Sequence, residues 1–275
     1  MNRLLSALLF SLLFSLLHSA PAAAQVVTGV PADLEGVDIV PRLGDQVPLG
    51  DVFFDEDGRE VTLGSYVNGS KPTLLVLAYF ECPMLCTLVM NGTVRAMQNI
   101  TQVPGQDFEL VLVSFDPKET PAMAGPKKRS YMKMYGGDQT AAGWHFLTGS
   151  QESIRSLTDG VGFHYKWIEE RQEFAHGSGI FFLTPDGKLS RFLGGIVFES
   201  LDVRLALLEA GEGKIGGAAE QIILFCYHYD PTTGRYAPAA AQLMSIASGF
   251  SLLILLGFLA FWWRRDLSRK KEAKA

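Results

Sequence analysis

Two cysteines lie one helical turn apart in the stretch "YFECPMLC", which spans residues 79–86. Cys82 and Cys86 are separated by three residues, and Pro83 follows the first of them. Side chains at positions i and i+4 of a helix share one face, with Cβ atoms about 5–6 Å apart. Two sulfurs placed in this way can hold one small ion or undergo dithiol redox chemistry. Because thiolates are soft ligands that favour Cu(I), whereas structural zinc needs four ligands, the pair predicts copper binding first.

The elements around this pair predict where the sulfurs lie. Residues 73–80, "TLLVLAYF", form a continuous apolar run of the kind that fills a strand buried on both faces. A helix is expected from Pro83 to about Ile100, since proline suits the first turn of a helix. The cysteines would then lie at the carboxyl end of the sheet, where α/β proteins place their sites. The backbone N–H groups and the dipole at this end of the helix stabilise thiolates.

The rest of the middle region alternates between predicted strands and helices. A second buried strand is expected at residues 108–115, and hairpins at 52–66 and 179–195, where Asp57-Gly58 and Pro185-Asp186-Gly187 form the turns. This order predicts an α/β fold with a central, mainly parallel sheet and an antiparallel hairpin at one side. The remaining helices are expected at residues 118–135, 150–160 and 198–210.

The two ends of the chain are predicted to direct it to a membrane and to anchor it there. Residues 1–24 combine a positive start, a Leu- and Phe-rich stretch and an "AAA" ending, as in a secretory signal peptide. Residues 241–263 contain a long uncharged stretch that ends in two tryptophans, which predicts a transmembrane helix. The basic tail, residues 264–275, is expected in the cytoplasm by the positive-inside rule. The chain is therefore predicted to be a single-pass protein of the cytoplasmic (inner) membrane, with its middle region on the extracytoplasmic, periplasmic side.

Charge and cysteine content narrow the class of function. The net charge is −5 although the tail is basic, so the middle region is acidic, which argues against nucleic-acid binding. The chain has three cysteines, an odd number and fewer than exported disulfide scaffolds carry. An oxidising compartment would tend to close Cys82 and Cys86 into a redox-active disulfide, which is the alternative state of this pair. A working dithiol there therefore needs either a reductant or a metal.

Three motifs, in this order, resemble the Sco/SenC family: "FECPMLC" at 80–86, "SFDPKETP" at 114–121 and "FAHGSGIFFLTPDGK" at 174–188. The resemblance covers roughly residues 45–210. It implies a membrane-tethered protein of thioredoxin-like fold with a central mixed sheet, here at residues 25–212. Such proteins carry copper to the binuclear copper centre of respiratory oxidases.

The resemblance also implies the ligands. The family binds copper through both cysteines and one distant histidine, which correspond here to Cys82, Cys86 and His176, for one ion of Cu(I) or Cu(II). Asp116, in the second motif, is implied as a supporting or structural residue. The place of His176 in "HGSG", just before "GIFF", indicates a flexible segment that lets the ring swing in and out. From the residues alone, the chain after residue 24 offers four histidines as candidates: His145, His164, His176 and His228.

Some features lie outside the family's commoner pattern. Thr87 follows the second cysteine, where proline is frequent, and the predicted anchor is carboxy-terminal instead of amino-terminal. In the predicted juxtamembrane segment, residues 213–240, Cys226 and His228 would share one face of a strand, either as a second metal site or as simple packing. Met84 could lend a thioether to copper, although packing at the start of the helix is the simpler expectation.

The sequence therefore predicts a copper metallochaperone, not an enzyme, that passes copper by ligand exchange to the copper-binding subunit of a terminal oxidase. An upstream copper donor or thiol reductant is an expected partner. The alternative is a thiol-disulfide oxidoreductase that reduces the recipient's cysteines before metal loading. The Cys-x-x-x-Cys spacing and the lack of a proline just before "GIFF" weigh against it. A peroxide-reducing relative of the same fold is a third option, but no arginine adjoins Cys82 or Cys86 in the sequence.

Overall fold

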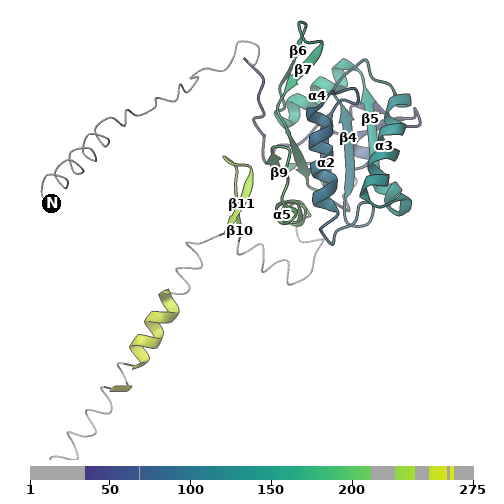
Figure 1. Ribbon diagram of the computed structural model, residues 1–275. Helices are drawn as coiled ribbons and strands as arrows, with labels where there is room; N and C mark the ends of the chain where they lie inside the picture. Colours follow the sequence, from purple (N-terminus) through teal and green to yellow (C-terminus); the bar gives the residue numbers. More distant parts are fainter. Residues whose placement is uncertain (1–34, 68, 212–226, 239–247, 259–260, 263–275) are drawn as a thin grey trace, which may run out of the picture. The chain divides into compact units, whose positions relative to one another are not determined.

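A mixed sheet organises the part of the chain that the computed structural model describes, namely residues 35–67, 69–211, 227–238, 248–258 and 261–262. In these residues seven strands form one sheet in the order β2-β1-β5-β4-β3-β8-β9, with helices packed around it (Figure 1). This architecture confirms the predicted α/β fold with a central mixed sheet.

The centre of the sheet consists of three parallel strands. β3 (Thr73–Ala78) pairs with β4 (Glu109–Ser114), and β4 pairs with β5 (Trp144–Gly149). All six side chains of β3 and all six of β4 are buried, as the two apolar runs predicted. A strand covered on both faces has no solvent side, and this is why its residues are apolar without alternation.

Antiparallel hairpins complete the sheet on both sides. β1 (Val52–Phe54) and β2 (Glu60–Thr62) form one hairpin, and β1 also pairs with β5. The second hairpin consists of β8 (Gly179–Leu183) and β9 (Leu189–Gly194), and β8 lies beside β3. Both hairpins were predicted from their turn residues, but the expectation of a mainly parallel sheet with a hairpin at one side is wrong. Of the six pairings in this sheet only β3 with β4 and β4 with β5 are parallel, because a hairpin is added at each edge.

In the described part of the chain, four α-helices pack around the sheet: α2 (Leu85–Met97), α3 (Pro121–Tyr135), α4 (Gln151–Val161) and α5 (Ser200–Ala210). α2 begins two residues later than predicted, because its N-cap residue Met84 has a non-helical backbone (φ −150°, ψ −62°). Pro83 therefore precedes the helix, and its expected place in the first helical turn is wrong. α2 packs against both α3 and α5.

The sequence did not predict β5, nor a small separate hairpin of β6 (Tyr165–Ile168) and β7 (Glu173–His176). The side chains of β7 are all half-buried, so this hairpin has neither the apolar run of a central strand nor a clean alternation. Such a pattern carries little signal, although the hairpin presents a residue of the site described below.

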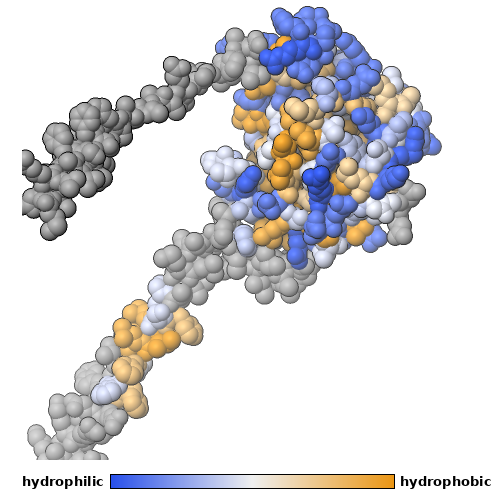
Figure 2. All heavy atoms as spheres, viewed as in Figure 1, coloured by the Kyte–Doolittle hydropathy of each residue, from blue (hydrophilic) through white to orange (hydrophobic). Residues whose placement is uncertain are grey.

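The C-terminal region contains a further hairpin, β10 (Tyr227–Asp230) and β11 (Arg235–Pro238). The Tyr229 hydroxyl donates a hydrogen bond to the Phe192 carbonyl of β9. Residues 248–258 are helical, with mostly hydrophobic and exposed side chains (Figure 2). Within the described residues, no helix has both the length and the hydropathy needed to cross a membrane, so the predicted span at 241–263 is not found there. The predicted signal peptide (1–24) and basic tail (264–275) lie outside the described residues.

Candidate metal centre

Cys82 lies in the loop between β3 and α2, and Cys86 is the second residue of α2. The backbone N–H of Tyr79 donates to Cys86 Sγ at 3.4 Å, and the backbone N–H of Cys86 donates to Cys82 Sγ at 3.2 Å. Cys82 and Cys86 are free thiols, with relative exposures of 9% and 4%. The two sulfurs therefore lie at the junction between β3 and α2, as the sequence predicted.

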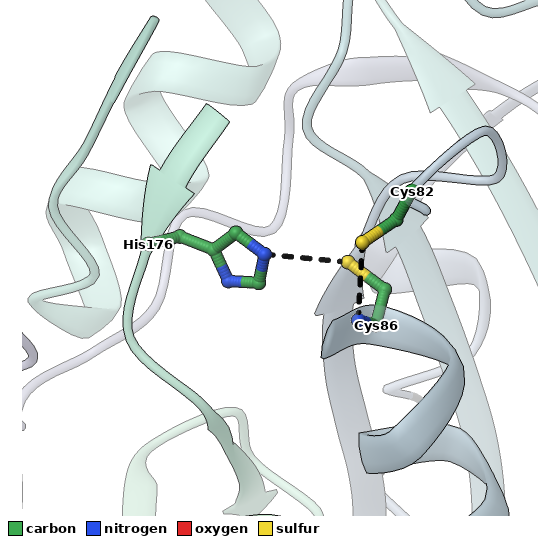
Figure 3. A group of neighbouring side chains, drawn as sticks. All are labelled: Cys82, Cys86 and His176. Carbon is green, nitrogen blue, oxygen red and sulfur yellow. Dashed lines mark hydrogen bonds between the residues drawn. The ribbon is translucent and has the colours of Figure 1, made fainter. Parts of the chain in front are cut away.

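His176 approaches the sulfurs from the opposite side (Figure 3). Its Nε2 lies 3.5 Å from Cys86 Sγ, although 90 positions separate the two residues in the chain. Its Nδ1 is 2.7 Å from the carbonyl oxygen of Gly177. A carbonyl can only accept, so Nδ1 carries the hydrogen, and in the neutral ring the lone pair of Nε2 faces the sulfurs. A backbone partner on the far nitrogen is typical of metal-binding histidines.

The position of His176 is set by a strand, and the mobility that the sequence indicated for its segment stays a prediction. It is the last residue of β7 and pairs with Tyr165 of β6. Its ring lies edge-on to Phe115, with ring centroids 5.1 Å apart. A Cβ added at Gly177 would lie 2.7 Å from the Ile39 side chain, so glycine allows the chain after His176 to approach that residue closely.

The donor atoms of Cys82, Cys86 and His176 all lie within 4.8 Å of one another. In the described residues, these three side chains are the one group of at least three His, Cys, Asp or Glu residues whose geometry could hold a metal ion. Two thiols and one imidazole are a soft donor set that suits copper and leaves a four-coordinate structural zinc one ligand short. The residues present therefore fit one copper ion.

The two cysteines differ in acidity. The hydrogen bond with the Cys86 thiol lowers the pKa of Cys82 to about 3, because it stabilises the Cys82 thiolate. Hydrogen bonds from backbone N–H groups act in the same direction, while burial opposes them. Burial raises the pKa of Cys86, and the neighbouring Cys82 thiolate raises it further. The metal-free site is therefore one thiolate hydrogen-bonded to one thiol.

Tyr79, the residue after β3, connects the two halves of the site. Its ring lies edge-on to Phe174 of β7 and to His176, with ring centroids 5.4 and 6.1 Å apart. Burial and the Cys82 thiolate both raise the pKa of Tyr79, so the hydroxyl stays protonated and can donate to the sulfur. The sequence reasoning did not single out this residue, although Tyr79 opens the quoted cysteine stretch.

Glu119 is a second residue that the sequence reasoning missed. Its buried carboxylate accepts the backbone N–H groups of Phe80 and Glu81, both at 2.8 Å, and the hydroxyl of Ser114 at 2.5 Å. It therefore holds the start of the cysteine loop. Asp116, implied as a supporting or structural residue, accepts the backbone N–H of Lys118 at 2.9 Å and caps its own turn, which is a structural role.

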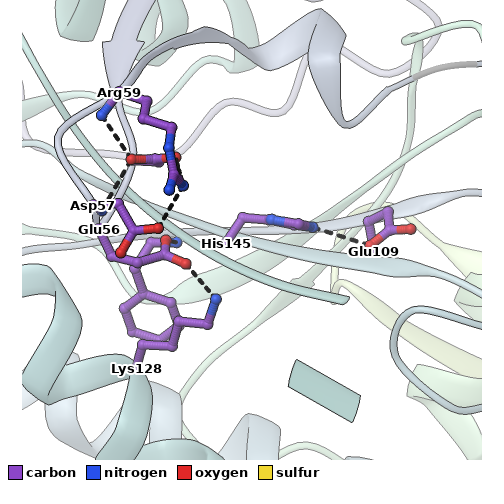
Figure 4. A network of polar contacts seen from close by, with 8 residues as sticks. Glu56, Asp57, Arg59, Glu109, Lys128 and His145 are labelled. Carbon is purple, nitrogen blue, oxygen red and sulfur yellow. Dashed lines mark hydrogen bonds and ion pairs between the residues drawn. The ribbon is translucent and has the colours of Figure 1, made fainter. Parts of the chain in front are cut away.

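Two of the other histidines have carboxylate partners. His145 Nε2 lies 3.1 Å from Glu109 (Figure 4), and His164 Nδ1 lies 2.5 Å from Asp38. His228 lies in β10, a strand as predicted, but Cys226 is outside the described residues, so the suggested second metal site stays a prediction. The side chain of Met84 is 64% exposed, so its expected packing at the helix start is wrong.

Comparison with known proteins places these residues in a family. The SCO1/SenC family model matches residues 52–198, more than half of the chain, and the match includes all three donors. A Stutzerimonas stutzeri protein named "Putative copper-binding protein" is 23% identical over 120 residues. That match covers 42% of this chain and 54% of the other protein, so the chain spans about half the length of this curated relative.

Solved structures show the same fold. A "putative electron transfer protein" from Aquifex aeolicus VF5 has a TM-score of 0.54 at 24% identity, covering 62% of this chain and 95% of its own. A "putative electron transport protein" from the same organism has a TM-score of 0.50 at 24% identity, covering 62% and 99%. These likenesses concern the mixed-sheet, thioredoxin-like fold.

Proposed function

This chain belongs to the SCO1/SenC family, and on that basis we propose that it is a copper chaperone. It holds one copper ion at Cys82, Cys86 and His176 and delivers it to the copper-binding subunit of a respiratory oxidase. The observation that carries this proposal is the convergence of two sulfurs and one imidazole nitrogen within 4.8 Å from segments far apart in the chain.

The donor set supports cargo in either oxidation state. Two thiolates suffice for Cu(I), and the neutral imidazole supplies the third ligand that Cu(II) requires. The Cys82 pKa of about 3 means that one sulfur is ready to bind without first losing a proton. Binding then displaces the proton that burial holds on Cys86.

We also propose that the domain works on the extracytoplasmic side of the cytoplasmic membrane. The support is in the sequence: a signal-like start at 1–24 and an apolar stretch at 241–263 followed by a basic tail. A tethered chaperone meets a membrane-bound recipient by motion along one surface. Alkaline phosphatase fused after residue 240 tests this orientation, because it is active only outside the cytoplasm.

Copper titration tests the proposed function. The reduced full-length chain, purified in detergent, should bind one equivalent of copper. His176→Ala should weaken Cu(II) binding by about a hundredfold or more, since losing even a supporting contact of a metal ligand costs about 10–100-fold. Cu(I) affinity should fall less, because both sulfurs remain. His164→Ala is the matched control and should leave both affinities unchanged; equal losses in the two variants would refute the role of His176.

A second candidate function, thiol-disulfide oxidoreduction, is favoured by the different acidities of the cysteines. A thiolate at Cys82 beside a protonated Cys86 is the arrangement of an attacking and a resolving thiol. Reduction of a model disulfide such as insulin distinguishes the two functions. Fast turnover by the metal-free chain, unchanged in His176→Ala, would favour the oxidoreductase.

A further inference from the structure

Two hollows of very different size reach the cysteines. One, of about 600 Å³, opens beside Cys82 and is lined by Phe80, Glu81, Met123 and Lys127 as well. The other has room for only about 10 Å³ and meets Cys86, with Lys127 and Tyr131 among its walls. The first can admit the side chain of another molecule, whereas the second holds at most about one water.

Access to the metal centre is therefore unequal. A ligand that arrives through the larger hollow meets Cys82 before Cys86, because Cys82 lines that hollow. Cys86 is 4% exposed and receives a hydrogen bond from the Tyr79 backbone, so it lies behind the loop. Exchange of copper by ligand replacement should begin at Cys82.

The wall of the larger hollow favours one kind of ligand. Met123 and Lys127 are four residues apart on α3, so they share one face of that helix. Met123 supplies apolar, polarisable surface, and Lys127 supplies a cation beside the metal centre. The exposed carboxylate of Glu81 lines only the larger hollow, whereas Lys127 lines both hollows, so Lys127 is the charged group that both hollows share.

Resting on the copper-chaperone function proposed above, we propose that this hollow is the port through which an acidic, thiol-bearing segment of the recipient protein reaches copper. The incoming thiolate forms a new copper–sulfur bond as the bond to Cys82 breaks. Cys82 leaves with its electron pair as a thiolate, and copper stays Cu(I) throughout, so no oxidant or reductant is required. Lys127 is the residue that lowers the repulsion between the incoming anion and a centre that already holds two thiolates.

The charge of the port can be tested with two model acceptors. The full-length chain loaded with Cu(I) is mixed without oxygen with a short Cys-x-x-x-Cys peptide, flanked either by glutamates or by lysines. Rapid gel filtration then gives the copper recovered with the peptide over time. Lys127→Gln should slow transfer to the acidic peptide about fivefold, the size expected for losing one favourable partly exposed charge contact. Transfer to the basic peptide should not slow.

Matched variants separate the effect of the Lys127 charge on the transfer rate from the effect of the width of the hollow. Lys133→Gln removes the same charge from an exposed position of α3 and should leave both rates unchanged, while Lys127→Arg should keep the wild-type rate. Met123→Trp narrows the hollow and should slow transfer to both peptides, with one copper still bound. Each rate is compared with that of the wild type for the same peptide, so the peptides' own copper affinities cancel.

The outcomes are distinguishable. If Lys127→Gln leaves transfer to the acidic peptide unchanged, or Lys133→Gln slows it equally, the charge preference is wrong. Unchanged rates in a folded Met123→Trp variant would show that ligands enter elsewhere. A wild-type chain that binds no copper through its cysteines would instead refute the proposed function and the port with it.

Discussion

Two clusters of polar side chains lie beside the same sheet and behave differently. In the ion cluster, the Glu109 carboxylate at the start of β4 pairs with Lys71. Figure 4 shows its contact with His145 and the pair of Glu56 with Lys128. In the metal centre, by contrast, two sulfurs and an imidazole nitrogen lie within 4.8 Å of one another (Figure 3).

The difference is whether the charges are already paired. Each carboxylate of the ion cluster has a cationic partner on the protein, so the cluster is complete and its role is to stabilise the fold. The donors of the metal centre become mutually repulsive once both cysteines lose their protons. Such a group of donors is complete only when a cation joins it, which is why it indicates function and not stability.

The largest effect should come from removing both sulfurs. Cys82→Ser combined with Cys86→Ser should reduce copper binding from one equivalent to almost none, because hydroxyls are hard, poor ligands for Cu(I). The free energy of unfolding should fall by only about 1–2 kcal/mol, the cost of burying two hydroxyls with partial hydrogen bonding. Metal analysis after gel filtration and chemical denaturation measure the two quantities. If the double variant still bound one equivalent of copper, the sulfurs would not be the metal ligands, and the functional difference between the metal centre and the ion cluster would be refuted.

The opposite pattern is expected in the ion cluster. Glu109→Gln leaves Lys71 without its carboxylate partner, and the free energy of unfolding should fall by about 3 kcal/mol. Copper stoichiometry should stay at one. Chemical denaturation of both proteins, with copper titration as the control, checks this prediction, and a loss of copper binding would contradict it.

The same variant should show a definite pH dependence. Burial alone would raise the pKa of Glu109, but hydrogen bonds with His145 and Lys71 outweigh burial and hold the pKa below its ordinary value of 4.5. The folded state therefore binds the Glu109 proton less tightly than the unfolded state does. The stability that Glu109 contributes is present above the ordinary pKa and is lost as the pH falls through the folded value. The gap between wild type and Glu109→Gln should accordingly narrow on acidification below about pH 4.5 in denaturation curves.

A smaller effect should follow from changing the support of the cysteine loop. Glu119→Gln replaces one oxygen by an NH₂ group that cannot accept, so one backbone N–H of the loop loses its partner. Copper affinity should fall about tenfold, as for other residues that orient metal ligands. The control is Asp116→Asn. Asp116 lies in the same turn, but its carboxylate accepts the backbone N–H of Lys118 and does not hold the cysteine loop. Similar affinities in both variants would show that Glu119 does not position the loop.

The smallest expected effect is a difference in how steeply the alkylation rate of Cys82 rises with pH. Because the pKa of Cys82 is about 3, its alkylation by iodoacetamide in the folded, metal-free chain should be nearly independent of pH between about 5 and 8. In the unfolded chain, a thiol with the ordinary pKa of 9.0 should react about tenfold faster per pH unit over the same range. Mass spectrometry of the Cys82 peptide gives both rates. A steep profile in the folded chain would mean that the hydrogen bond with Cys86 does not stabilise the thiolate.

The central elements could be predicted because their signals are local. The apolar runs of β3 and β4 need no partner to be recognised, and the glycines of the two hairpin turns have positive φ, 79° at Gly58 and 88° at Gly187, which few other residues adopt. The cysteine pair is equally local, since one helical turn separates its members. These features are set by neighbours in sequence.

The rest of the site depends on tertiary structure. His176 reaches the cysteines only because β7 pairs with β6, and that half-buried hairpin has no clear periodicity. Choosing His176 from the residues alone was therefore impossible, and only the resemblance to a family selected it. Glu119 supports a loop 38 and 39 positions earlier in the chain, a contact that becomes visible only when the strands are placed side by side. Asp116 was chosen instead because it forms the more conspicuous Asp-Pro pair.

X-ray absorption at the copper edge tests the central claim most directly. The full-length chain loaded with Cu(I) should show one copper bound by two sulfurs and one nitrogen, and His176→Ala should keep both sulfurs while losing the nitrogen. A spectrum without sulfur ligands, or one that the double serine variant reproduces, would contradict the assignment of Cys82, Cys86 and His176 as the copper site.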